Sequence, residues 1–108
     1  MATHHATPGE VVNLDTWAND LATDQTKAIA KTEEMELVRL VLSAGEHVPN
    51  HKVSGPITVQ CVKGKIEFTA MGATQEIAQG ELLYLMPGEP HSVKAIENAV
   101  ILLTIVFK

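Results

Sequence analysis

The stretch that decides the fold is PITVQCVKGKIEFTAM, residues 56–71. Apolar and polar residues alternate along both halves of it, and Lys63-Gly64 lies between the halves. Alternation gives a β-strand one apolar face, and glycine tolerates the positive φ of a tight turn. The stretch therefore predicts a two-residue hairpin, followed by a second one at Met71-Gly72-Ala73. Its apolar positions are expected to line one interior, and they are Ile57, Val59, Cys61, Ile66, Phe68 and Ala70.

Short runs of β-branched and aliphatic residues continue on both sides of this stretch, with Gly or Pro between them. Such spacing is typical of an antiparallel sandwich or barrel. The last run, 99–107, is apolar on both faces, so one face is covered by a second subunit or by the N-terminal leader. We expect a homodimer because symmetric pairs are the commonest oligomers. The predicted strands are 35–43, 56–62, 65–71, 74–78, 82–86, 91–96 and 99–107, with 26–31 as a further candidate.

Length and composition indicate one compact domain. The chain has 108 residues, of which 45% are apolar, and this suffices for one hydrophobic core. We divide it into a leader, residues 1–32, that packs on the barrel, and a barrel domain, residues 33–108. In the leader, Asp15 is a candidate N-cap for a short helix through Trp17, Leu21 and Ala22.

Charge and cysteine content exclude several classes of partner. The net charge is −5 with no basic cluster, which argues against nucleic acid. No run approaches the roughly 18–20 apolar residues that span a bilayer, so no membrane partner is expected. The single cysteine cannot form an internal disulfide and fits a reducing compartment. A cytoplasmic protein is therefore expected.

Two spaced motifs carry a family resemblance. Gly45 is followed after five residues by His51, and Gly80 is followed later by Pro87-Gly88-Glu89-Pro90-His91. In this order they resemble the two motifs of the cupin superfamily, and residues 51–60 are similar to small single-domain, RmlC-like bacterial cupins of uncharacterised function. The resemblance implies an all-β, cupin-type jelly-roll barrel that encloses a small pocket.

The resemblance also implies a metal position. Metal-binding cupins hold one divalent ion, such as Zn, Ni, Fe or Mn, between three histidines and a glutamate. His51 and His91 stand at two of these positions, whereas Val53 replaces the second histidine and Ile57 or Thr58 replaces the glutamate. Because two imidazoles leave most of the coordination shell to water, they make a weak site.

Two further residues are open candidates for a third ligand. If the segment before His51 is extended, His47 lies ~13 Å away along the strand, too far to share an ion. Gln60 points away from the pocket if the apolar face of its strand lines it, unless a bulge reverses the alternation.

Two other residues are assigned to the ligand pocket together with His51, His91 and Gln60. Tyr84 lies on a strand that runs toward His91 and can present its hydroxyl to a ligand, although packing is the simpler role. Cys61 lies on the apolar face, where burial raises the pKa of a thiol and leaves it unreactive.

Three functions remain. The first is a module that binds a small molecule in the barrel pocket, with or without a divalent metal. The second is a metal-dependent enzyme of the dioxygenase, isomerase or lyase kind. The third is a dimeric scaffold without a working pocket. We favour the binding module, because the two loop histidines are present while the full catalytic set is not.

Overall fold

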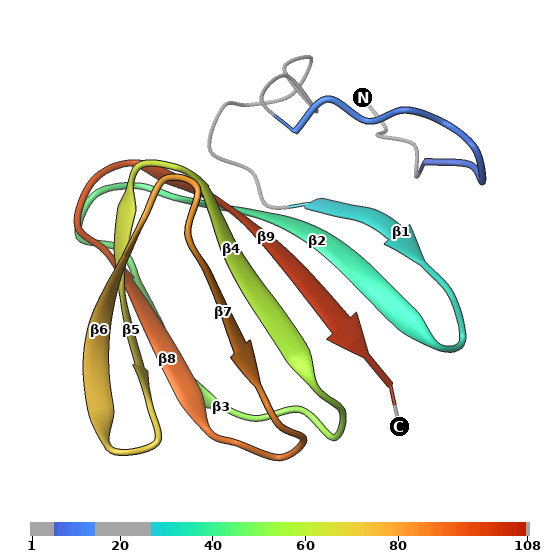
Figure 1. Ribbon diagram of the computed structural model, residues 1–108. Coiled ribbons are helices and arrows are strands. Elements are labelled where there is room, and N and C mark those ends of the chain that lie inside the picture. The colour runs from blue at the N-terminus through green and yellow to red at the C-terminus, as the bar shows by residue number, and fades with distance from the viewer. Residues whose placement is uncertain (1–5, 15–26, 108) are drawn as a thin grey trace.

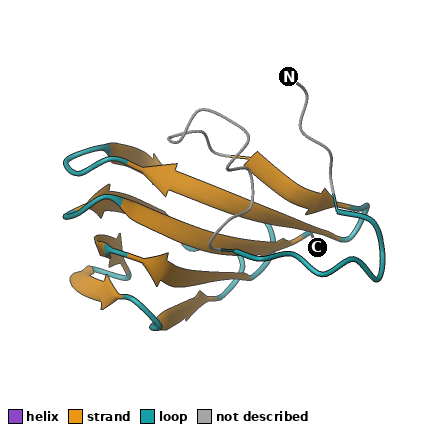
Figure 2. Cartoon of the chain, turned by 90° about the horizontal axis from the view of Figure 1, so that it is seen from above, coloured by secondary structure: helices purple, strands orange, loops and turns teal. Residues whose placement is uncertain are grey.

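The fold consists of two antiparallel β-sheets packed against each other (Figure 1). The computed structural model describes residues 6–14 and 27–107, and every regular element within them is a strand (Figure 2). One sheet has the order β1-β2-β9-β4-β7 and the other the order β3-β8-β5-β6. The helix predicted at Asp15 lies outside the described residues. The strands are β1 (Lys27–Lys31), β2 (Met35–Leu42), β3 (His47–His51), β4 (Ile57–Lys63), β5 (Lys65–Ala70), β6 (Ala73–Ala78), β7 (Leu82–Leu85), β8 (His91–Ala95) and β9 (Ala99–Val106).

The core lies between the sheets, where alternate residues of the strands point inward. Ile57, Val59 and Cys61 of β4 are at most 3% exposed, and Ile66 and Phe68 of β5 at most 1%. The common interior predicted for these two strands is therefore confirmed. Each aliphatic or aromatic side chain buried in this way contributes roughly 1.5–3 kcal/mol, so the two strands together supply much of the apolar burial that holds the sheets together.

The first predicted hairpin, at Lys63-Gly64, is wrong. β4 pairs with β7 and β9, whereas β5 pairs with β6 and β8, so the chain turns a corner from one sheet to the other. Gly64 has a φ of +83°, and a Cβ on it would overlap the carbonyl oxygen of Asn98 and lie 2.9 Å from Cα of Ala99. The glycine is thus required by a close approach of two backbone segments as well as by φ.

The second predicted hairpin is confirmed. β5 and β6 pair along their whole length, from Lys65 opposite Ala78 to Ala70 opposite Ala73. The connecting residues Met71 and Gly72 both have positive φ, +56° and +77°. This is the combination that a two-residue hairpin turn needs to match the twist of its strands.

β3 is a strand that apolar periodicity does not predict. Its sequence, HVPNH, contains Pro49 and Asn50, which are both disfavoured in strands. It is tolerated because β3 is an edge strand that, among the described strands, pairs with β8 alone, so the missing N–H of Pro49 need not interrupt a central ladder. The register shifts between Val48 and His51, which places a bulge at the proline.

The N-terminal segment, residues 6–14, lies over the outer face of β1 and β2. The amide of Ala6 donates to the carbonyl of Ile29 at 2.7 Å, and Nε of Arg39 donates to the carbonyl of Leu14 at 2.9 Å. The dimer expected from the outer face of β9 stays a prediction. Across residues 6–14 and 27–107, we find no helix with the length and apolar character needed to cross a membrane.

Candidate functional site

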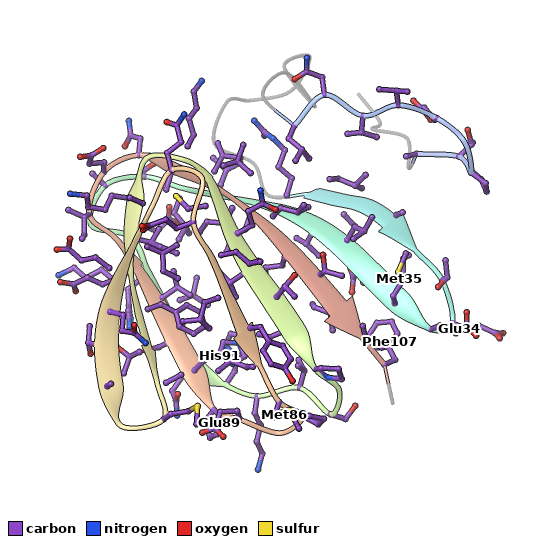
Figure 3. All side chains as sticks on the ribbon, viewed as in Figure 1. Glu34, Met35, Met86, Glu89, His91 and Phe107 are labelled. Atoms are coloured by element: carbon purple, nitrogen blue, oxygen red, sulfur yellow. The ribbon has the colours of Figure 1, made fainter. Side chains whose placement is uncertain are left out.

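Two histidines from different strands meet at one end of the four-stranded sheet. His51 ends β3, His91 begins β8, and the two residues are register partners. Their ring centroids are 4.3 Å apart and their planes make an angle of 62°, which is an edge-to-face contact. Figure 3 shows His91 at the end of the sheet near Met86 and Glu89. The structure brings together the two histidines that the sequence selects, and their role as ligands stays a prediction.

The backbone carbonyl two residues earlier orients each imidazole. Nδ1 of His51 lies 3.0 Å from the carbonyl oxygen of Pro49, and Nδ1 of His91 lies 3.0 Å from that of Glu89. Because a carbonyl oxygen accepts hydrogen bonds and never donates them, each Nδ1 carries the proton. In the neutral ring, Nε2 is then an acceptor or a metal ligand. In its neutral form, each of the two histidines therefore presents an Nε2 lone pair.

His91 is buried, whereas His51 is exposed. His91 is 4% exposed, and its ring stacks on Phe68 with the centroids 5.6 Å apart and the planes 12° apart. Burial disfavours the imidazolium and lowers the pKa of His91; the carbonyl of Glu89 acts in the opposite direction, and His51 adds a smaller lowering. His91 is therefore neutral at pH 7 and keeps its Nε2 lone pair.

A small pocket is lined in part by two neighbours of His91, Phe68 and Ala70, although neither histidine is itself a lining residue. It has a volume of about 190 Å³ and lies between the free edges of β6 and β7. Phe68 stacks on His91, and Ala70 is the cross-strand partner of His91. The pocket is lined by Phe68, Ala70, Met71, Ala73, Gln75, Leu83, Tyr84 and Leu85. The sequence analysis did not assign Phe68 and Ala70 to the pocket. The alternation of β5 does indicate that both side chains point inward, but the pairing of β5 with β8, which places them beside His91, cannot be predicted from the local sequence.

The other three predicted pocket residues do not share one site. Tyr84 lines the pocket, and its hydroxyl donates to Sδ of Met86 at 2.9 Å. Gln60 lies on the outer face of the five-stranded sheet, since it alternates with the buried residues of β4. Cys61 is buried in the core, its thiol donates to the carbonyl of Lys63 at 3.3 Å, and burial raises its pKa. Of the three, Tyr84 alone joins the pocket beside His91.

Few side chains at this site can coordinate a metal ion. His47 begins β3 and pairs with Lys94, away from the histidine pair, and Val53 packs against the core. In the part of the chain that the structure describes, no three His, Cys, Asp or Glu side chains are grouped so as to hold an ion. Two imidazoles alone do not fit a tightly bound structural or catalytic ion, which takes three or four protein ligands.

Known proteins resemble this chain in structure. No family model matches the sequence, and no curated protein does. A cupin superfamily protein from Desulfitobacterium hafniense superposes with a TM-score of 0.84 at 12% identity, over 100% of both chains. A conserved protein of unknown function from Streptococcus pyogenes gives 0.79 at 21% identity, over 100% of this chain and 96% of that one. An RmlC-like cupin from Desulfovibrio desulfuricans gives 0.70 at 24% identity, over 98% and 96%. These likenesses establish a cupin-type jelly-roll fold.

Proposed function

We propose that this cupin-fold protein binds a small ligand at the His51–His91 pair, with both Nε2 atoms as acceptors. The observation that carries the proposal is the matched orientation of the two rings. In each ring, Nδ1 donates a hydrogen bond to the backbone carbonyl of the residue two positions earlier, at 3.0 Å in both cases. The ring centroids are 4.3 Å apart. In their neutral form, two imidazoles held in one tautomer are a double acceptor, which suits a ligand that carries hydroxyl, amine or amide donors.

The neighbouring pocket supports an apolar portion in the same ligand. Phe68 contacts both His91 and the pocket, and Ala70, Leu83 and Leu85 add apolar lining. Ligand sites commonly combine an apolar wall with a few placed polar groups. At about 190 Å³ this pocket is below the roughly 300–1,000 Å³ of drug-sized sites. The proposal therefore specifies a small molecule with donors at one end and a short apolar body.

A weakly held metal ion is the second candidate. The carbonyls of Pro49 and Glu89 fix the tautomer of the two rings, which is what second-shell partners do for histidine ligands. If an ion binds, His51 and His91 hold it through Nε2, and water fills the remaining positions and exchanges. Such an ion would polarise a bound donor group. Within the described residues, no third His, Cys, Asp or Glu is grouped with the pair so as to hold an ion, which favours ligand binding over metal-dependent catalysis.

A fragment screen followed by nuclear magnetic resonance tests the proposal. The probes are short-chain alcohols, amides and amines, and the readout is the chemical shift of the imidazole nitrogens of His51 and His91. Saturable shifts are expected in the parent protein and in His47→Gln, which changes the exposed histidine at the other end of β3. They should be lost in His51→Gln. Because His51 is exposed, this variant should fold, and its amide spectrum verifies that it does.

Elemental analysis and zinc titration of untagged protein separate the two candidates. Binding of fragments without metal supports the double acceptor, whereas binding that requires stoichiometric metal, lost in His51→Gln, supports the second candidate. If no probe gives a saturable shift with or without zinc, or if the shifts persist unchanged in His51→Gln, the proposed site is wrong.

A further inference from the structure

A second cavity lies far from the histidine pair, beneath the N-terminal segment. We name residues 6–14 the strap, because bonds at both of its ends tie it to the five-stranded sheet. The bond from Ala6 to Ile29 fixes one end and the bond from Arg39 to Leu14 fixes the other. In Figure 1 the strap runs beyond β1, on the opposite side of the molecule from β5 and β6.

The middle of the strap forms a hydrogen-bonded turn. The amide of Glu10 donates to the carbonyl of Thr7 at 3.0 Å, and the amide of Thr7 donates to the Glu10 carboxylate at 2.9 Å. Gly9 has a φ of +89°, as the turn requires, and Pro8 restricts the chain further. The strap therefore has a defined shape that arches over the sheet and leaves a hollow beneath it.

The hollow has the size and lining of a ligand site. Its volume is about 670 Å³, which falls within the roughly 300–1,000 Å³ of small-molecule pockets. The floor comes from β1, β2 and the turn between them, the roof comes from the strap, and most of the surface is apolar. The lining residues are Ala6, Thr7, Pro8, Glu10, Val12, Ile29, Ala30, Lys31, Thr32, Met35 and Leu37.

Two charged side chains limit the chemistry of the occupant. Glu10 already accepts hydrogen bonds from the amide and hydroxyl of Thr7, so its carboxylate stabilises the turn of the strap. Lys31, at the end of β1, is exposed and, among the described residues, is the one cation in the lining of the hollow. An apolar body with one carboxylate would satisfy both the walls and the lysine. The strap is hydrogen-bonded to the sheet at both of its ends, and this favours a small molecule over a folded partner surface as the occupant.

We propose that the hollow beneath the strap binds an elongated apolar carboxylate, with the apolar chain against Ile29 and Leu37 and the carboxylate at Lys31. The site is independent of the histidine pair. Figure 3 labels Met35, which lines the hollow, and His91, and the two lie well apart on different sheets.

Isothermal titration calorimetry with straight-chain carboxylates, from butanoate upward and below their micelle concentrations, tests the proposal. Affinity is expected to rise about fourfold per methylene, the equivalent of ~0.8 kcal/mol, until the hollow is full and then to level off. Lys31→Gln should weaken binding by up to about fivefold, as expected for an exposed ion pair. Lys94→Gln, on the other sheet, removes the same charge and should have no effect.

Ala30→Phe places a ring in the hollow and should abolish binding while the circular dichroism spectrum stays that of the parent. His51→Gln should bind the carboxylates as the parent does, which separates this site from the proposed function. Affinity that does not depend on chain length, or that is the same in Lys31→Gln and Ala30→Phe as in the parent, overturns the proposal. So does the absence of saturable binding.

Discussion

Replacement of Gly64 by alanine is the sharpest perturbation of the fold. The left-handed φ of +83° costs an alanine about 1–2 kcal/mol. The new Cβ would also overlap the carbonyl oxygen of Asn98 and crowd Cα of Ala99. This segment cannot easily give way, because Ala99 is 2% exposed and Oδ1 of Asn98 accepts a bond from the amide of Ala44 at 2.8 Å. Overpacking of this kind adds about 1–3 kcal/mol.

The expected loss for Gly64→Ala is therefore roughly 2–5 kcal/mol, out of a total stability of about 5–15 kcal/mol. Urea denaturation followed by far-ultraviolet circular dichroism measures it as a lower midpoint at unchanged slope. Gly72→Ala is the matched control, since Gly72 has a φ of +77° but nothing within 4 Å of a Cβ. It should lose the backbone cost alone, about 1–2 kcal/mol. Equal losses in the two variants would refute the argument that the corner depends on close backbone approach.

Three further predictions concern the turn, the site and the surface. Met71 has a φ of +56° and is 73% exposed, so Met71→Asn should raise the free energy of unfolding by about 1 kcal/mol in the same assay; a loss contradicts this. Folding lowers the pKa of His91. In the pH range between the ordinary histidine pKa of about 6.5 and the lower folded pKa, the unfolded chain therefore binds more protons than the folded protein does. Stability should therefore fall as pH drops through this range to the folded pKa, and His91→Gln should flatten that dependence. Leu82 is 61% exposed on the outer face of β7; Leu82→Glu should convert the expected dimer to a monomer by light scattering, whereas Lys94→Glu should not, and a monomeric parent rules the dimer out.

Alternation along β4 and β5 predicts which residues are buried but not which strands pair. Two strands with inward apolar faces give the same pattern in one sheet or in two sheets that face each other. The register of β4 with β9 shifts between Cys61 and Lys63, and a bulge there increases the bend of the strand just before the corner. Local turn chemistry at Gly64 is equally compatible with a hairpin and a corner, so the contact with Asn98 decides between them.

The leader illustrates a second limit of local patterns. The sequence predicts a strand at 26–31, and β1 confirms it within one residue. Its inclusion in the five-stranded sheet depends on pairing with β2, which starts beyond the boundary we placed at residue 33. The strap carries no apolar periodicity, and its position follows from two long-range hydrogen bonds at Ile29 and Arg39. Such bonds join residues that no short window contains.

The position of the histidine pair depends on a bulge, and this explains why residue types were predictable at the site while geometry was not. The register of β3 and β8 begins with His47 opposite Lys94 and Val48 opposite Val93. Regular continuation would place Asn50 opposite His91, because each lies two residues further along its strand. The observed partner of His91 is His51, so the extra residue at the bulge brings an imidazole, in place of an amide, against the buried ring. Bulges commonly re-aim side chains in this way next to functional sites. Since β3 is an edge strand with a proline at the bulge, it contributes few core contacts, and its irregular register is better explained by the placement of His51 than by the stability of the sheet.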